Sequence, residues 1–143
     1  MLVDANLLLY AVDERSLHHQ RARDWLTTVL NGDRRVALPW MSLGAFLRIS
    51  TNPRASARPL RPADAWRLVS DWLACDVTWI PGPTEHHAEV LGSLVLRYDL
   101  RANMITDAQL AALAIEHGLA VCSADTDFAR FTEIRWVNPL ASE

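Results

Sequence analysis

Short apolar runs alternate along this chain with longer segments in which apolar residues recur at helical spacing. The short runs have the length and the composition of buried strands, while the longer segments carry one apolar face, as amphipathic helices do. Strands are predicted over residues 1–4, 36–38, 77–80, 119–123 and 135–137. Helices are predicted over residues 6–12, 17–30, 41–49, 84–98 and 103–117, with another that starts at Pro62.

Residues with strong positional preferences mark several helix ends. Ser16 and Thr84 are predicted N-caps, because their hydroxyl oxygens can accept from the free backbone N–H groups of a first turn. Pro62 suits a first helical turn, and Gly118 is a predicted C-cap. Residues 54–62 contain two prolines and three arginines with little apolar content, which predicts an exposed loop.

The alternation of strands and helices predicts an α/β fold. Such an order is typical of a mostly parallel central sheet covered by helices on both faces, a three-layer α/β/α arrangement. The chain has 143 residues, of which 50% are hydrophobic and 22% are charged, so it can bury one sizeable core and lacks the composition of a disordered protein. We therefore expect a single domain over residues 1–143.

The charge balance narrows the possible partners. A net charge of −3 argues against nonspecific wrapping of nucleic acid, but it leaves room for a local basic stripe. All 14 basic residues are arginine, and the chain has no lysine. The apolar stretch over residues 7–12 is too short to cross a membrane and no basic segment precedes it, so we expect a cytoplasmic protein.

Four aspartates fall where an α/β sheet gathers its ligands. Asp4 ends the first predicted strand, Asp125 and Asp127 follow the fourth, and Asp107 lies near the start of the preceding helix. Ligands of such sheets bind beyond the carboxyl ends of the strands, where the strand order reverses. Crowded carboxylates need a cation, and oxygen ligands without clustered cysteine or histidine favour Mg²⁺ or Mn²⁺ over Zn²⁺. The pattern predicts a metal centre formed by these four carboxylates.

Each aspartate also has a structural interpretation when it is taken alone. Asp4 can cap a helix, Asp107 can complement a helix dipole, and Asp125 with Asp127 can form a turn. Four smaller polar residues are candidates for orienting the acidic ligands, with capping or turn roles as equal alternatives: Asn6, Asn103, Thr106 and Ser123.

Three segments together resemble the PIN-domain ribonucleases and, more narrowly, the VapC toxins of bacterial VapBC toxin–antitoxin modules. They are LVDAN at 2–6, NMITDAQLAALA at 103–114 and SADTDFARF at 123–131. The resemblance implies a PIN fold, a site for Mg²⁺ or Mn²⁺, hydrolytic cleavage of RNA, a homodimer and inhibition by a VapB antitoxin. Asp4, Asp107 and Asp125 match the acidic positions of that family, and Asp127 is an additional acid nearby.

One position departs from the family pattern. A glutamate usually stands just before the segment Phe46-Leu-Arg48, where this chain has Ala45. A missing carboxylate would weaken cation binding or shift a water molecule. The alternative function is therefore a PIN-like module that binds or regulates without efficiently cutting RNA.

Arginines supply the candidate contacts with RNA phosphates. A guanidinium group can form two parallel hydrogen bonds with a phosphate, which fixes the position of the backbone without reading its sequence. The candidates stand at the end of the Phe-Leu-Arg segment and in the predicted exposed loop: Arg48, Arg54, Arg58 and Arg61. The alternative for arginines on a loop is that they are only solvated, which is the commoner case.

Other enzymes that begin with a strand and an aspartate are excluded by missing residues. A phosphotransferase of the haloacid-dehalogenase type needs a second aspartate two residues after Asp4, where this chain has Asn6, and it also needs a lysine. A response-regulator receiver needs the lysine as well. A dinucleotide-binding or P-loop enzyme needs a glycine-rich first turn, and none follows Asp4.

Overall fold

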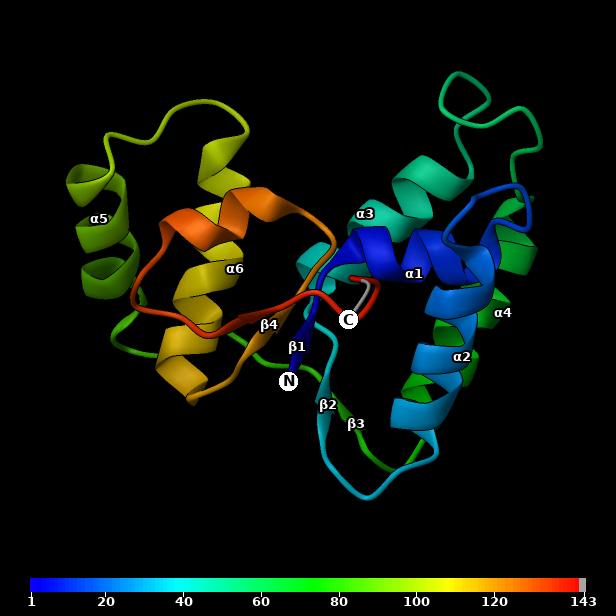
Figure 1. The fold of residues 1–143 in the computed structure, drawn as a ribbon, viewed down its shortest axis with the longest axis horizontal. Helices are drawn as coiled ribbons and strands as arrows, with labels where there is room; N and C mark the ends of the chain where they lie inside the picture. The colour runs from blue at the N-terminus through cyan, green and yellow to red at the C-terminus, as the bar shows by residue number, and fades with distance from the viewer. Residues whose placement is uncertain (142–143) are drawn as a thin grey trace.

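A sheet of five parallel strands lies between two groups of helices in the computed structural model, which describes residues 1–141 (Figure 1). The strand order is β3-β2-β1-β4-β5, and each neighbouring pair is parallel. The predicted α/β/α fold with a mostly parallel sheet is therefore confirmed. The strands are β1 (Leu2–Val3), β2 (Val36–Ala37), β3 (Thr78–Trp79), β4 (Val121–Cys122) and β5 (Trp136–Val137).

The helices divide between the two faces of the sheet. Four helices gather on one side in Figure 1: α1 (Ala5–Val12), α2 (His19–Leu30), α3 (Trp40–Ser50) and α4 (Pro62–Leu73). The other side carries α5 (His87–Arg97), α6 (Met104–His117) and the short 3₁₀ helix η1 (Thr126–Arg130). No helix in the described part of the chain is long and apolar enough to cross a membrane.

Successive strand residues point to opposite faces, which explains why the strands are apolar without alternation. Val3 packs in the core on the α1–α4 side, whereas its neighbour Leu2 packs in the core on the α5–α6 side, and both are fully buried. In β2, Val36 likewise packs in the core on the α1–α4 side and Ala37 in the core on the α5–α6 side. A sheet covered on both faces needs apolar residues at every strand position.

Two predicted helix starts were wrong. The second helix begins at His19 rather than Leu17, because Ser16 accepts a hydrogen bond from the backbone of His18 in the turn before it. Helix α5 begins at His87, after a similar turn in which the hydroxyl of Thr84 accepts from His86. In both cases the hydroxyl accepts from the backbone N–H two residues later, so it stabilises a turn that precedes the helix and does not cap the helix itself.

The predicted C-cap at Gly118 is confirmed. This residue ends α6 with a φ of 66°, a left-handed conformation that strains residues with a side chain. The chain reaches β4 after Leu119 and Ala120.

Glu116 ties the loop after β3 and the start of α5 to the end of α6. Its side chain is fully buried and accepts from the Thr84 backbone at 2.9 Å and the Thr84 hydroxyl at 2.7 Å, and it pairs with the His87 ring at 2.7 Å. Burial raises the pKa of Glu116, but the hydrogen bonds from His87 and Thr84 outweigh it and bring the pKa below its ordinary value. The ionised carboxylate thus stabilises the fold.

Replacement of this carboxylate should destabilise the protein. We expect Glu116→Gln to lower the free energy of unfolding by about 1–3 kcal/mol at pH 7, because the amide oxygen can still accept from Thr84 but the amide carries no charge and turns an NH₂ group towards the His87 ring. Since the folded pKa is depressed, the contribution is present above the ordinary pKa of 4.5 and is lost as the pH falls through the folded value. Urea unfolding at pH 7 and pH 4 measures both effects.

Glu85→Gln provides the matched control. Glu85 pairs with the neighbouring His86 at 3.5 Å, but its side chain is 86% exposed, so the variant should unfold like the wild type. Equal stability of the Glu116→Gln protein and the wild type at pH 7 would contradict the role of Glu116.

Candidate active site

The site lies at the carboxyl ends of β1 and β4, where the strand order reverses. The chain moves from β1 outward to β2 and β3, and then returns to place β4 on the other side of β1. Asp4 follows β1 directly, and its backbone N–H donates to the carbonyl of Cys122 at 2.9 Å. Asp125 follows β4 at the same edge. The predicted location at a topological switch point is therefore occupied by two carboxylates from adjacent strands.

Three carboxylates approach one another closely in this region. Asp107, Asp125 and Asp127 each offer an oxygen atom, and these atoms all lie within 4.8 Å of one another. Asp107 comes from the first turn of α6, and Asp125 caps η1 by accepting from the backbone of Asp127 at 2.9 Å. The cap fixes where η1 begins and so determines where Asp127 lies. The trio forms an acidic cluster that can hold a metal ion.

Asp4 stands beside this trio rather than within it. One of its oxygens accepts from the Ala5 backbone at 2.7 Å, which caps α1. The other accepts from the hydroxyl of Ser123 at 2.7 Å and from the amide of Asn6 at 3.4 Å. From the sequence, helix capping and membership of the acidic site are alternative roles for Asp4. In the structure its side chain caps α1 and also stands beside the acidic trio.

The negative charge of the carboxylates is only partly compensated. Partial burial, followed by the charges of Asp125, Asp4 and Asp127, raises the pKa of Asp107 to about 6, while Arg130 acts to lower it. Burial also raises the pKa of Asp4, against the hydrogen bonds from Ser123 and Ala5 that lower it. A bound cation would favour the ionised carboxylates and so offset both the burial penalty and the mutual repulsion, which fits these residues to a divalent metal ion.

Ser123 connects the two strand ends. Its hydroxyl is fully buried, donates to Asp4, and accepts from the Asn6 amide at 3.1 Å and the Asp125 backbone at 3.0 Å. The carbonyl oxygen of Asn6 in turn accepts from the backbone of Ala124 at 3.3 Å. The structure thus brings the predicted supporting residues Asn6 and Ser123 into direct contact with the acidic residues.

The other two predicted supporting residues are placed differently. Asn103 precedes α6 without forming a side-chain cap, and both Asn103 and Thr106 are exposed. Neither side chain makes a hydrogen bond within residues 1–141. Their proximity in sequence to Asp107 therefore does not produce a contact with its carboxylate.

Two residues that sequence reasoning missed contact the site. The guanidinium of Arg130 lies 3.6 Å from the carboxylate of Asp127, in the i, i+3 spacing that signals a helical ion pair. The indole N–H of Trp136 donates to the Ser123 carbonyl at 3.0 Å. The first contact has a signal in the sequence, whereas the second requires knowledge that β5 pairs with β4.

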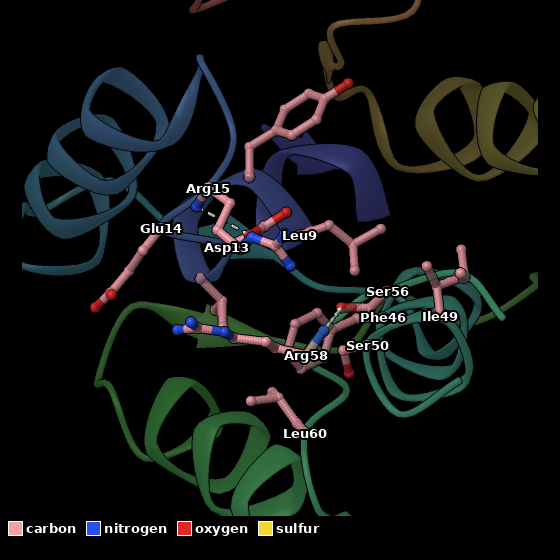
Figure 2. Close-up of a pocket in the computed structure, with 13 residues that line it drawn as sticks. Leu9, Asp13, Glu14, Arg15, Phe46, Ile49, Ser50, Ser56, Arg58 and Leu60 are labelled. Carbon is pink, nitrogen blue, oxygen red and sulfur yellow. Dashed lines mark hydrogen bonds between the residues drawn. The ribbon is translucent and has the colours of Figure 1, made fainter. Parts of the chain in front are cut away.

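The four arginines predicted to bind RNA do not gather at the carboxylates. Arg48 and Arg54 are exposed, and Arg61 pairs with Asp64 at 3.0 Å at the start of α4. Arg58 lines a groove of about 450 Å³ between the ends of α1 and α3 and the segment 55–60 (Figure 2). Figure 1 shows this segment on the side of the molecule away from α6. Their role in RNA binding stays a prediction.

The groove near Arg58 is mainly apolar. Leu9, Phe46, Ile49 and Leu60 form its walls, and Asp13, Glu14 and Arg15 stand at the end of α1 (Figure 2). None of the four site aspartates lines it. The groove is therefore a second concave surface, separate from the acidic site.

Ala45 occupies the position where the family pattern has a glutamate. It is half-buried in α3, one turn after Ser42, whose buried hydroxyl donates to the Val3 carbonyl at 2.6 Å. Residues three apart share a helix face, so Ala45 lies on the face of α3 that meets the end of β1. A methyl group stands there instead of a carboxylate.

Comparisons with known proteins agree with this geometry. The PIN domain family matches residues 1–134. Ribonuclease VapC37 of Mycobacterium tuberculosis is 42% identical over 140 residues, which cover 98% of this chain and 97% of the relative.

Solved structures share the fold at lower identity. VapC20 of Mycobacterium tuberculosis, a toxin that cleaves the sarcin–ricin loop, has a TM-score of 0.68 at 20% identity, covering 94% of this chain and 98% of that one. VapBC2 of Rickettsia felis, solved bound to a DNA fragment from its promoter, has a TM-score of 0.68 at 13% identity over 96% of each chain. With an acidic site at the switch point of a parallel sheet and a full-length likeness to a VapC ribonuclease, this chain belongs to the PIN-domain family and, within it, to the VapC ribonucleases.

Proposed function

We propose that this protein is a metal-dependent endoribonuclease that acts as the toxin of a toxin–antitoxin module. The convergence of Asp107, Asp125 and Asp127, with Asp4 beside them, is the observation that carries the proposal. Asp4, Asp107 and Asp125 are assigned as the catalytic carboxylates, and Asp127 is an additional metal ligand. The substrate class follows from family membership and from the ribonuclease names of the relatives.

We infer that the ion is Mg²⁺, with Mn²⁺ as a substitute. The ligand atoms that lie close together are carboxylate oxygens of three aspartates, and within the described residues no cysteine or histidine joins this group. Oxygen ligands of this kind favour Mg²⁺ or Mn²⁺ over Zn²⁺. A divalent cation supplies Lewis-acid stabilisation of the charge that develops on the scissile phosphate. The raised pKa of Asp107 supports a cation at this site, because a positive charge offsets the burial penalty and the repulsion from the neighbouring carboxylates that raise it.

The protein's own residues hold this arrangement in place. The Ser123 hydroxyl fixes Asp4 and the Asp125 backbone at once, so that the ends of β1 and β4 keep a constant separation. Asn6 supports the same hydroxyl from the first turn of α1. Preorganised ligands of this kind reduce the reorganisation needed when RNA binds.

We propose that a VapB-type antitoxin inhibits the enzyme and that the toxin forms a homodimer. The similar Rickettsia felis structure is of a VapBC complex, which supports an antitoxin as partner. We also propose that residues 1–143 act as one domain in the cytoplasm, where RNA is available. Mapping RNA ends after induced expression, with and without the neighbouring open reading frame, tests the substrate and the antitoxin together.

Removal of the Asp4 charge should abolish cleavage while the protein remains folded. In Asp4→Asn the amide oxygen can still accept from the backbone of Ala5, so α1 keeps its cap, but the acidic site loses one negative charge. We expect metal-dependent RNA cleavage to fall by at least about 100-fold and growth toxicity to disappear, with the far-ultraviolet circular dichroism unchanged.

The control for this experiment is Asp24→Asn. Asp24 is exposed on α2, accepts from Gln20 at 2.9 Å and lies outside the acidic cluster. Its replacement should leave cleavage unchanged. Full activity of purified Asp4→Asn protein would remove Asp4 from the site.

Metal binding should depend on pH through Asp107. Because its folded pKa is raised to about 6, this carboxyl group binds a proton more tightly in the folded protein than in the unfolded chain. The proton must leave before the metal binds, so Mn²⁺ affinity should fall about tenfold for each pH unit below about 6 and level off at higher pH. Calorimetric titration with Mn²⁺ from pH 5 to pH 8 measures this, and a flat profile would contradict it.

The alternative of a weakened module rests on Ala45. Since this residue shares a face of α3 with Ser42, which contacts the residue before Asp4, a carboxylate introduced there lies close to the acidic site. We expect Ala45→Glu to increase both Mn²⁺ affinity and RNA cleavage by roughly 3- to 30-fold, because the glutamate adds one further oxygen ligand. Ala57→Glu, an exposed substitution in the loop before α4, is the control. Unchanged affinity and cleavage in the Ala45→Glu protein would show that another group already serves at this position.

A further inference from the structure

Arg130 occupies an unusual position for a charged residue of a surface helix. It ends η1, and its side chain is only 26% exposed. Its Nε donates to the backbone carbonyl of Asp127 at 3.1 Å, and its guanidinium lies 6.0 Å from the ring centre of Phe131. The hydrogen bond and the ring restrict the guanidinium to one region beside the acidic cluster.

The outer nitrogens of this guanidinium donate no hydrogen bond to the described residues. The nearest carboxylate oxygen, on Asp127, is 3.6 Å from Nη2, which is too long for a hydrogen bond. Within residues 1–141, the Nε bond is the one hydrogen bond that Arg130 makes. An arginine side chain that is 26% exposed therefore keeps two terminal NH₂ groups that donate no hydrogen bond within residues 1–141 and can donate to a planar anion.

The negative charge of the acidic cluster opposes the approach of an RNA phosphate, so a basic residue beside the cluster favours binding. Asp4, Asp107, Asp125 and Asp127 together repel an RNA backbone, and one divalent cation balances only two of these four charges. Arg130 is the basic residue whose charge acts on Asp107. It therefore reduces the repulsion at the place where a phosphate must approach, which Arg58 cannot do from the separate groove.

We propose that Arg130 binds an RNA phosphate beside the acidic cluster through its two free NH₂ groups, while its Nε remains anchored to the Asp127 carbonyl. The inference rests on the proposed RNA-cleaving function and adds a substrate-binding residue to it. In this role Arg130 contacts RNA and is not required to hold the metal. A positioning role through Asp127 alone would instead make metal binding depend on Arg130.

The two roles are separated by measuring metal and RNA affinity independently. The variants are Arg130→Gln, which removes the charge, and Arg130→Lys, which keeps the charge but loses the planar fork. The probes are Mn²⁺ alone, titrated by calorimetry, and a fluorescent random-sequence single-stranded RNA in Ca²⁺. Gel analysis confirms that this RNA stays intact during the binding measurement.

Arg97→Gln is the matched control. Arg97 also pairs with a carboxylate, on Glu133, and its guanidinium also lies near an aromatic ring, that of Tyr98 at 5.2 Å. It belongs to α5 and its side chain is 58% exposed. The substitution therefore removes an arginine with the same kinds of contact outside the acidic cluster, and thermal unfolding of all variants checks that each is folded.

We expect Arg130→Gln to weaken RNA binding about tenfold and to lower the slope of log affinity against log salt by about 0.7, with Mn²⁺ affinity equal to or above that of the wild type. Arg130→Lys should recover part of the RNA affinity, and Arg97→Gln should match the wild type.

Equal RNA affinity in Arg130→Gln and Arg97→Gln would overturn the inference but leave the nuclease function standing. A parallel loss of Mn²⁺ and RNA affinity would also overturn it, in favour of a positioning role. Absence of RNA binding and cleavage in the wild type would overturn the proposed function itself.

Discussion

The parallel pairing of β1 with β4 is the constraint on which the rest of the site depends. This register places Leu2 opposite Val121 and Val3 opposite Cys122, so that the next residues along both strands emerge side by side at one edge. The buried Ser123 hydroxyl can then donate to Asp4, and one hydrogen bond joins positions 119 residues apart in sequence. A shift of one residue in this pairing would turn every strand side chain to the opposite face and separate the two carboxylate-bearing ends.

The electrostatics of the acidic cluster oppose the stability of the metal-free fold. Because the pKa of Asp107 rises from 3.8 to about 6, its contribution to stability is greatest below pH 3.8 and is lost as the pH rises towards 6. A bound cation reverses this relation by favouring the ionised form. The stability of the ionised cluster at neutral pH therefore depends on compensation of its charge, to which Arg130 contributes from within the fold.

The two faces of the sheet serve different purposes. The α5–α6 side contributes Asp107 through α6 and positions η1 through the buried rings of Phe128 and Phe131. The α1–α4 side forms the larger apolar core and the groove near Arg58. Asp4 joins the two sides, because it ends a central strand, caps α1 and acts electrostatically on Asp107. The acidic site and the groove are thus built on one sheet without sharing a site aspartate.

The sequence alone determined the order of strands and helices and the positions of the four aspartates, because periodicity, caps and strand ends are local properties. It also marked Ala45 as a departure. Only the tertiary structure decided that Asp4 lies beside the carboxylate trio, that Ser123 connects β1 with β4, and that Arg130 rather than Arg58 faces the acidic cluster. The physical reason is that these contacts depend on strand pairing and helix docking, which bring distant residues together through packing that no local pattern specifies.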